Sequence, residues 1–268
     1  MDINYIANGD SLDLLKELSD NSIDLVVTSP PYDNMRSYGG VINQWNEDKF
    51  KAMAKELART LKDGGVIVWV VADQTINGSE SGTSFKQALH FKELGLNIHD
   101  TMIWRKINPM PNNQGKRYFN SFEYMFVFSK GTPKTFNPIM EKCKLGGTKV
   151  KASRTHLDIK EKRKMNRDFI VKEERYKYNV WDIAVSTNKT IHTAAFPLNL
   201  ARDHILTWSN KGDLVLDPFL GSGTTVIAAI ELERSFIGCE LNKDYYNESI
   251  KRIENKINEI NNNLKSVA

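Results

Sequence analysis

The first third of the chain alternates short apolar runs with amphipathic stretches. The runs at 23–27 and 66–71 consist almost entirely of apolar and β-branched residues, which is typical of strands buried on both faces. In the stretches at 11–18 and 47–61, apolar residues recur at helical spacing. A turn at 63–65 separates the second helix from the strand that follows. This alternation predicts an α/β fold in which helices cover both faces of a mostly parallel sheet.

Two later stretches, 98–104 and 122–128, are rich in aromatic and β-branched residues. The loop between them contains Pro109, Pro111 and Gly115. We expect these stretches to form an antiparallel hairpin at the edge of the sheet.

The periodicity fades between 131 and 179, where the density of charge rises. Pro133 and the glycine pair 146–147 interrupt this segment. We therefore expect an insertion at 131–179 that lies outside the central sheet, and a main domain formed by 1–130 and 180–268.

Regular α/β patterning resumes toward the end of the chain. It predicts helices at 198–209 and 224–232 and strands at 214–216 and 235–239, so both ends of the chain contribute to the sheet. The last stretch places apolar residues at alternating spacings of three and four, on one face of a helix. This stripe consists of Ile250, Ile253, Ile257, Ile260 and Leu264. We expect it to pack on the chain's own sheet in preference to forming a dimer seam.

Composition indicates a folded, soluble protein. Of the 268 residues, 40% are hydrophobic and 26% are charged, close to the averages for such proteins. The longest strongly apolar run, 66–72, is far too short to cross a bilayer, and the N-terminus lacks the pattern of a secretory signal. We therefore expect a cytoplasmic protein. Cys143 and Cys239 lack paired Cys or His spacing, which predicts two reduced thiols and no metal site.

The net charge of +4 is unevenly distributed. Between 141 and 177 there are thirteen Lys or Arg residues and six Asp or Glu residues, a local excess of +7 that leaves −3 for the remainder. A basic segment on a mildly acidic body indicates contact with a polyanion, although a solvated basic face has the same composition.

The sequence DPFLGSGTT at 217–225 lies where a predicted strand ends and a helix begins. Gly221 and Gly223 allow a tight turn, and the helix N-terminus offers amide groups to a carboxylate or phosphate. Glu240 follows Gly221 by nineteen positions, at the end of the next strand, where doubly wound folds place an acid that binds ribose hydroxyls. Val226 stands where a dinucleotide fingerprint has its third glycine, which disfavours NAD. The pattern therefore predicts a cofactor that contains a ribose.

The sequence TSPPYDN at 28–34 follows directly after a buried strand. Two consecutive prolines stiffen the backbone and lack amide hydrogens, so the carbonyl groups of Ser29 and Pro30 can act as fixed acceptors. Tyr32 adds an aromatic face beside them. Acceptors next to a stacking ring suit a flat amino-substituted base that has been flipped out of a duplex. A rigid proline turn with a core tyrosine is the structural alternative.

TSPPY resembles the catalytic motif of the amino-directed DNA methyltransferases, and DPFLGSGTT resembles their S-adenosylmethionine-binding motif. The order, with the catalytic motif first, is similar to the circularly permuted beta class, cytosine amino type, of restriction-modification enzymes. Further segments resemble the same family: NGDSLDLLKEL at 8–18, HTAAFP at 192–197, GCELNKDYY at 238–246, and the loop at 108–117 with SFEYMFVFSKG after it. The resemblance implies a Rossmann-like methyltransferase fold and covers nearly everything outside the basic insertion.

The resemblance also implies two sets of site residues. The catalytic set is Ser29, Pro30, Pro31 and Tyr32. The set that binds S-adenosylmethionine is Asp10, Thr28, His192, Phe196, Asp217, Pro218, Phe219, Gly221, Ser222, Gly223, Thr224 and Glu240. Within it, Asp10 is expected to contact the adenine of the cofactor.

The implied chemistry is direct methyl transfer to an exocyclic amine. The lone pair of such an amine is delocalised into the ring, and hydrogen bonds to the Ser29 side chain and the Pro30 carbonyl would localise it on nitrogen. Orientation and local electrostatics then supply the acceleration, without a covalent intermediate or a metal. In the family, Ser at the first motif position accompanies methylation of the 4-amino group of cytosine, whereas Asp or Asn there accompanies methylation of the 6-amino group of adenine. Ser29 therefore favours cytosine, and adenine remains the alternative.

Double-stranded DNA is the expected partner, contacted by basic residues through its phosphates. One candidate is Arg36, although Arg36 and Asp33 can equally be interpreted as a surface pair. The candidates in the insertion are Lys149, Lys151, Arg154, Lys162, Arg163, Lys164 and Arg167. A catalytically silent nucleic-acid-binding module and an RNA or protein methyltransferase are rival interpretations. A companion restriction endonuclease and a homodimer are left open.

Overall fold

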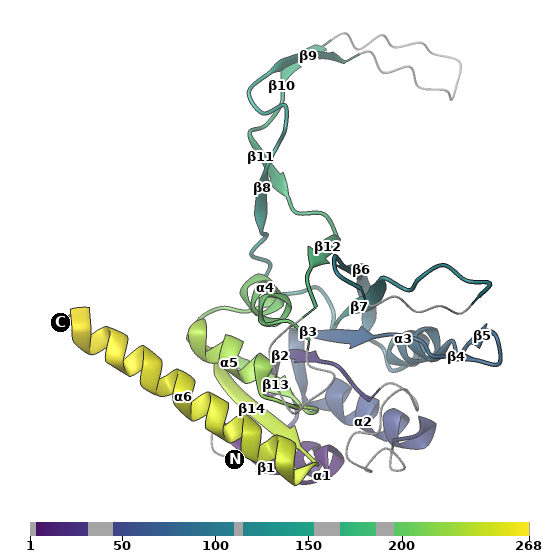
Figure 1. Cartoon of the computed structure of the whole chain (residues 1–268), viewed down its shortest axis with the longest axis vertical. Coiled ribbons are helices and arrows are strands. Elements are labelled where there is room, and N and C mark those ends of the chain that lie inside the picture. The colour runs from purple at the N-terminus through teal and green to yellow at the C-terminus, as the bar shows by residue number, and fades with distance from the viewer. Residues whose placement is uncertain (1–3, 32–44, 110–114, 153–166, 186–195, 268) are drawn as a thin grey trace. The chain divides into compact units, whose positions relative to one another are not determined.

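The computed structural model describes the stretches 4–31, 45–109, 115–152, 167–185 and 196–267. Figure 1 shows the arrangement of their helices and strands. By its internal contacts the chain divides into two compact units. The first unit consists of Met1–Asn137 and Asn179–Ala268, and the second of Pro138–Tyr178.

The first unit contains all the described helices and the main sheet. The helices are α1 (Ser11–Glu17), α2 (Glu47–Thr60), α3 (Thr83–Glu93), α4 (Leu198–Trp208), α5 (Thr224–Glu231) and α6 (Lys243–Val267). The strands of the main sheet are β1 (Tyr5–Asn8), β2 (Ile23–Thr28), β3 (Leu61–Val71), β6 (Asn97–Lys106), β7 (Phe122–Ser129), β12 (Val180–Ile183), β13 (Leu214–Asp217) and β14 (Ser235–Glu240). A separate small hairpin pairs β4 (Thr75–Ile76) with β5 (Ser79–Glu80).

The main sheet is mostly parallel and has the strand order β1-β14-β13-β2-β3-β7-β6-β12. Neighbouring strands run parallel except in the two pairs that include β7. The early strands β1 and β2 lie beside the late strands β14 and β13. The predicted parallel sheet, built from both ends of the chain, is therefore confirmed.

Both faces of the sheet are buried, as the side chains of the central strand β3 show. Ile67, Trp69 and Val71 belong to a buried cluster that includes residues of α1, α2 and α3. Val68 and Val70 are buried as well and point to the opposite face because strand side chains alternate. On that face α4 contacts β2, and α5 contacts β13. The apolar runs without polar alternation thus reflect strands covered by helices on both sides.

The turn predicted at 63–65 lies within β3 and does not precede it. Ile23 of β2 pairs with Leu61, whereas Leu25 pairs with Val66, so the ladder shifts register between these pairs. Gly64, with a φ of +78°, donates its amide to the carbonyl of Lys130. The chain therefore turns locally while β3 continues on both sides of the irregularity.

The predicted antiparallel hairpin of β6 and β7 is present but does not form the edge of the sheet. The short strand β12 pairs in parallel with β6 and takes the outer position. Trp181 of β12 is buried and stacks on His204 of α4, with 4.5 Å between the ring centroids. Burial of the Trp181 side chain holds β12 at the outer edge of the sheet. The strand is too short for the sequence pattern to identify it.

Helix α6 packs on the first unit over only part of its length. Ile253 is 4% exposed, whereas Ile257 is 39% exposed. Lys256, between them, pairs with Glu231 at the end of α5, at 2.7 Å. The helix has 25 residues, far more than α5 or β14, and its C-terminal part extends beyond the sheet (Figure 1). The prediction that the apolar stripe packs on the sheet is therefore wrong at Ile257.

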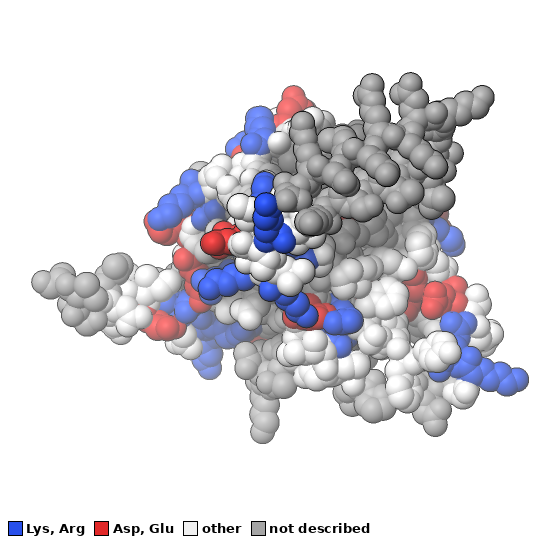
Figure 2. Space-filling model, turned by 90° about the horizontal axis from the view of Figure 1, so that it is seen from above, with Lys and Arg blue, Asp and Glu red and all other residues white. Residues whose placement is uncertain are grey.

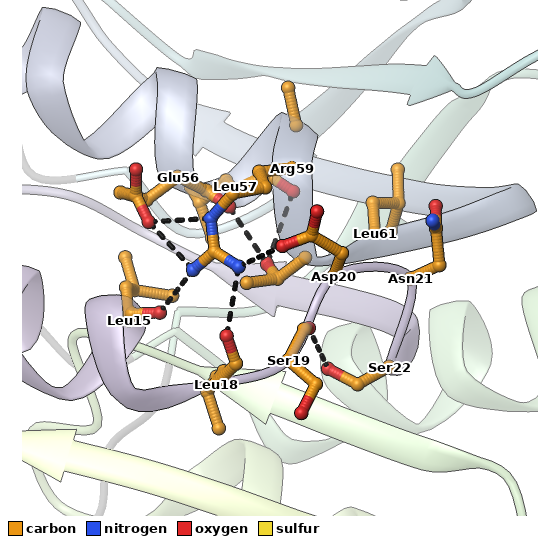
Figure 3. Close-up of polar contacts among 12 residues, drawn as sticks. Leu15, Leu18, Ser19, Asp20, Asn21, Ser22, Glu56, Leu57, Arg59 and Leu61 are labelled. Carbon is orange, nitrogen blue, oxygen red and sulfur yellow. Dashed lines mark hydrogen bonds and ion pairs between the residues drawn. The ribbon is translucent and has the colours of Figure 1, made fainter.

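Arg59 of α2 connects this helix to the last turn of α1 and to the segment between α1 and β2 (Figure 3). Its guanidinium donates to the carbonyl oxygens of Leu15 and Leu18, at 2.8 and 2.9 Å, and pairs with Asp20. Glu56 accepts a further hydrogen bond from the same guanidinium, at 2.8 Å. Because these groups precede β2 directly, Arg59 fixes the point at which β2 enters the sheet.

The second unit is a two-stranded ribbon with two antiparallel ladders. One ladder pairs β8 (Met140–Lys142) with β11 (Glu174–Tyr176), and the other pairs β9 (Lys149–Ala152) with β10 (Arg167–Ile170). The residues at 131–137, which we placed in the insertion, belong to the first unit. Within the described residues, none of the helices is both long and apolar enough to span a bilayer.

Candidate active site

The two motifs meet where the parallel strands β2 and β13 end side by side. Leu25 pairs with Val215, and Val26 pairs with Leu216. Two residues farther on, Thr28 Oγ1 donates a hydrogen bond of 2.6 Å to Asp217 Oδ1. The first residue of TSPPY thus contacts the first residue of DPFLGSGTT, although 189 positions separate them. The fold brings the predicted catalytic segment to the predicted cofactor turn.

Asp217 lies at the centre of this junction and is 2% exposed. Besides Thr28, its Oδ1 accepts the amide of Phe219 at 3.1 Å, and its Oδ2 accepts Thr225 Oγ1 at 2.6 Å. Burial raises the pKa of Asp217 to about 6, although these three hydrogen bonds favour the charged form. The three groups that donate to the carboxylate are all neutral. Three groups of the protein thus bind this side chain, and the cofactor contact expected for Asp217 stays a prediction.

Gly221 and Gly223 give the turn its shape. Their φ angles are +55° and +85°, in the left-handed region that favours glycine. The amide of Gly223 donates to the carbonyl of Leu220 at 2.9 Å, and Gly223 caps α5. The first amide groups of α5 therefore lie at the turn, where they can bind an anionic group because the first turn of a helix offers them no carbonyl partner.

Glu240 lies at the end of β14, beside the turn. Its Oε2 accepts the amide of Gly221 at 2.7 Å, and its Oε1 accepts the amide of Asn242 at 2.8 Å. Burial raises the pKa of this carboxyl group, while the hydrogen bonds from both amides oppose the shift. Each carboxylate oxygen can accept more than one hydrogen bond. Glu240 is therefore fixed against the turn and can still accept ribose hydroxyl groups.

Asp10 caps α1, and both of its carboxylate oxygens have partners within the protein. Oδ1 accepts the amide of Leu12 at 2.9 Å, and Oδ2 pairs with Lys49 Nζ at 2.5 Å. Burial raises the pKa of Asp10, but the bond from Lys49 and the amide of Leu12 outweigh it and lower the pKa overall. Lys49 lies 39 positions away on α2, and no local sequence signal links it to Asp10. Next to Asp10, Ser11 Oγ donates to the carbonyl of Pro218 at 2.6 Å and joins α1 to the turn.

An aromatic group beside the turn was not foreseen from the sequence. Phe219 of the turn contacts Trp45 edge to face, with 5.0 Å between the centroids, and Trp69 at 6.2 Å. Trp45 also contacts Phe50 of α2. Trp45 stands alone in a polar stretch, so nothing in its sequence surroundings indicates this role.

The remaining predicted residues divide into those that the structure describes and those that it does not. Ser29 and Pro31 are half-buried after β2, while Pro30, Pro218, Thr224 and Phe196 are buried. The residues outside the described stretches are Tyr32, Arg36, Arg154, Lys162, Arg163, Lys164 and His192. Lys149 is exposed at the start of β9; Lys151 and Arg167 lie on β9 and β10.

The residues of the turn fit S-adenosylmethionine. Ser222 Oγ is buried and has no hydrogen-bond partner within the described part of the chain, so it can bind a polar group of a ligand. Glu240 suits the ribose hydroxyls, and the first amides of α5 suit the carboxylate of the methionine part. Cys239 is unsuited to covalent catalysis because burial raises the pKa of its thiol to about 12. No group of three metal-binding side chains occurs among the residues described.

Comparison with known sequences gives matches over most of the chain. The DNA methylase family N6_N4_Mtase matches residues 23–251. The orphan methyltransferase M.BamHII of Bacillus amyloliquefaciens is 44% identical over 252 residues, which cover 90% of this chain and 92% of that protein. The type II methyltransferase M.SmaI of Serratia marcescens is 28% identical, over 91% of this chain and 89% of that protein.

Solved structures agree with this assignment. TTHA0409 of Thermus thermophilus, complexed with S-adenosyl-L-methionine, has a TM-score of 0.66 and 26% identity, covering 95% of this chain and 96% of that one. The cytosine-N4-specific PvuII DNA methyltransferase has a TM-score of 0.68 at 23% identity, covering 96% of this chain and 92% of that one, and supports the fold. The resemblance and the Rossmann-like methyltransferase fold predicted from the sequence are thus confirmed. The chain belongs to the N6/N4 DNA methylase family and is an S-adenosylmethionine-dependent DNA amino-methyltransferase.

Proposed function

We propose that this enzyme methylates the 4-amino group of cytosine in duplex DNA, with the target base flipped out of the helix. The junction of Thr28 with Asp217 supports this proposal, because it puts the TSPPY segment beside the cofactor turn. The choice of cytosine rests on Ser29, the residue type that accompanies this base in the family that the sequence resembles. The 6-amino group of adenine is the alternative.

The proposed chemistry assigns acceptor roles to residues at the end of β2. When bound, S-adenosylmethionine supplies an electrophilic methyl group on a sulfonium. Ser29 Oγ and the carbonyl oxygen of Pro30 accept hydrogen bonds from the exocyclic amine, which localises its lone pair on nitrogen. Pro30 and Pro31 keep this backbone rigid, and Tyr32 stacks on the flipped base. The nitrogen would bond to the methyl carbon as the bond between that carbon and the sulfur breaks, which leaves a neutral thioether, and the nitrogen would release one proton to water.

Replacing Ser29 with alanine tests this proposal. The variant loses one acceptor but no predicted cofactor contact, so we expect methyl transfer to fall about 100-fold while cofactor affinity stays within about threefold. The measurement is mass spectrometry of nucleosides from duplex DNA incubated with labelled S-adenosylmethionine. Ser22→Ala is the matched control, because Ser22 precedes the same strand and its hydroxyl bonds locally to Ser19.

The position of the label decides between the interpretations. Label in 4-amino-methylated cytosine that Ser29→Ala loses supports the proposal. Label in 6-amino-methylated adenine keeps the chemistry and overturns the choice of base. An undiminished rate in Ser29→Ala contradicts the role of the hydroxyl. Absence of label from DNA of varied sequence, with cofactor binding intact, points to RNA, to protein or to a silent binding module.

We also propose that the ribbon at 138–178 is the target-recognition part of the enzyme. This unit carries the basic excess, and it exposes large apolar side chains: Phe169 is 48% and Ile170 is 70% exposed. The basic residues do not form a uniform surface, since Arg175 pairs with Glu141 at 3.6 Å. On the face of the molecule shown in Figure 2, basic and acidic side chains likewise lie close together. A two-stranded ribbon has dimensions that the major groove of DNA admits.

Charge reversal in the ribbon tests this assignment. The double variant Lys149→Glu and Lys151→Glu is expected to bind duplex DNA more weakly, because cationic side chains release counterions from the phosphates. The slope of log affinity against log salt should fall by about 1 for each phosphate that the variant no longer neutralises. Titration of labelled duplex at several salt concentrations measures both quantities. Lys251→Glu, at an exposed position of α6, is the control, and equal losses of affinity in both variants would contradict the assignment.

A further inference from the structure

Side chains join β2 and β13 beyond the point where their backbone pairing stops. The ladder between these strands ends at the pair of Val26 and Leu216. Asp217, the residue after Leu216, accepts hydrogen bonds from Thr28 of β2 and Thr225 of α5, each at 2.6 Å. We call the three residues Thr28, Asp217 and Thr225 the strand-end link.

The strand-end link is almost completely buried. Thr28, Asp217 and Thr225 are 0%, 2% and 1% exposed. Thr225 Oγ1 also lies 3.2 Å from the carbonyl oxygen of Val27, so α5 contacts both strands. Buried hydrogen bonds of this kind restrict relative movement, because breaking one leaves a polar group without a partner in the interior.

We propose that the strand-end link is a positioning device for methyl transfer, in which the hydroxyl of Thr28 fixes the distance between the Ser29–Pro30 acceptors and the cofactor turn. The inference rests on the proposed function, because it takes Ser29 and Pro30 as the groups that bind the target amine. Thr28 is then a positioning residue, and it acts through its neighbour Ser29. This role differs from the cofactor contact that the sequence indicated for Thr28.

The position of Thr28 gives a physical reason for a large effect on rate. Ser29 follows it directly, and Pro218 and Phe219 follow Asp217 directly. Without the hydroxyl, the direct bond between the two strand ends would be lost, and they would be joined only indirectly, through Thr225 of α5, which lies against the carbonyl of Val27 and bonds to Asp217. A shift of about 1 Å between reacting groups can cost about 100-fold in rate, whereas cofactor affinity depends on contacts within the turn itself. Rate and affinity should therefore respond differently.

The geometry of the link can be tested separately from its charge. In Asp217→Asn, the amide oxygen can keep the bonds from Thr28 and from the amide of Phe219. The amide nitrogen can donate to Thr225, whose hydroxyl can then donate to the carbonyl of Val27. Glu240 on β14 is the charged neighbour that this change also affects. Asp217→Asn therefore removes the charge of the link while its hydrogen bonds can stay in place.

The decisive comparison is among Thr28→Val, Thr28→Ser and Thr60→Val. Thr28→Val removes the hydroxyl while keeping the shape, and we expect a single-turnover methylation rate about 30-fold lower with cofactor affinity within about threefold. Thr28→Ser restores the hydroxyl and should restore the rate. Thr60 is 0% exposed, and its hydroxyl donates to the carbonyl oxygens of Glu56 and Leu57 in the same helix, so Thr60→Val controls for loss of a buried hydroxyl.

Each outcome has a defined meaning. A normal rate in Thr28→Val, or equal losses in Thr28→Val and Thr60→Val, overturns the inference while leaving the proposed function intact. Failure of Thr28→Ser to restore the rate also overturns it. If Thr28→Val does not fold, Thr28→Ala against Thr28→Ser provides the same comparison. Failure of the proposed function itself appears separately, as an unmethylated DNA substrate with the wild-type enzyme or as full activity in Ser29→Ala.

Discussion

Replacing Gly223 with alanine is expected to weaken S-adenosylmethionine binding at least about tenfold and to lower the melting temperature. The φ of +85° costs an alanine about 1–2 kcal/mol. The added Cβ would also lie 3.2 Å from Ile253 Cδ1 and 3.3 Å from Ser249 Cβ, so α6 or the turn must shift. Because Gly223 caps α5 beside the cofactor turn, a shift there displaces the amides that we assign to the cofactor. Isothermal titration with the cofactor and thermal unfolding measure the two effects.

Gly212 provides a matched control for Gly223. Its φ is +84°, and a Cβ placed there would meet no atom within 4 Å. Gly212→Ala therefore carries the same backbone strain without the contact and away from the turn. We expect a stability loss of about 1 kcal/mol and unchanged cofactor affinity. Wild-type affinity in Gly223→Ala, or an equal loss of affinity in Gly212→Ala, would contradict the binding role of the turn.

The sequence predicts those parts of the fold that local patterns encode. The runs at 23–27 and 66–71 became β2 and β3, because apolar residues on both faces require cover on both faces. The edge strand β12 was missed because its four residues are placed by distant partners, with Trp181 stacking on His204. The helix α3 was missed as well. It has a weak apolar face, and its first turn is bound by Asp73, which accepts the amide of Ser84 at 2.9 Å.

The same holds for the site: local sequence patterns predict which segments form it, whereas the contacts of their side chains depend on residues that are distant in the sequence. The motif sequences place Ser29 and Asp217 at strand ends, since a strand followed by a turn is a local pattern. The direction of each side chain depends on what the fold brings near it. Asp217 turns toward Thr28, and Asp10 pairs with Lys49, in both cases over sequence separations that no motif spans. The sequence thus predicts the segments of the site, and the structure gives the contacts of those predicted residues that it describes.

The raised pKa of Asp217 leads to a prediction about the stability of the protein that does not depend on its activity. Its ordinary pKa of 3.8 rises to about 6 in the folded protein, where burial is the largest cause. Between these values the folded state binds more protons than the unfolded state, so the free energy of unfolding falls as the pH rises. The full contribution is about 3 kcal/mol, and roughly half of it is lost between pH 5 and pH 8. The charged carboxylate that the enzyme carries at neutral pH thus lowers its stability.

Asp217→Asn removes this titration and keeps a polar side chain of the same size. We expect the variant to gain stability relative to the wild type between pH 5 and pH 8, by about 1–2 kcal/mol. Urea unfolding of both proteins at the two pH values measures the difference. Glu240, whose pKa burial also raises, titrates in both proteins; the variant removes only the charge of Asp217, a smaller cause of that increase. If the two proteins show the same pH dependence, Asp217 does not bind its proton more tightly when folded.

The methyl-transfer rate of the same variant separates the two roles of Asp217. A variant that gains stability at pH 8 and still methylates DNA would show that the link works through its hydrogen bonds. A variant that gains stability and loses methyl transfer would show that the buried charge itself serves the reaction.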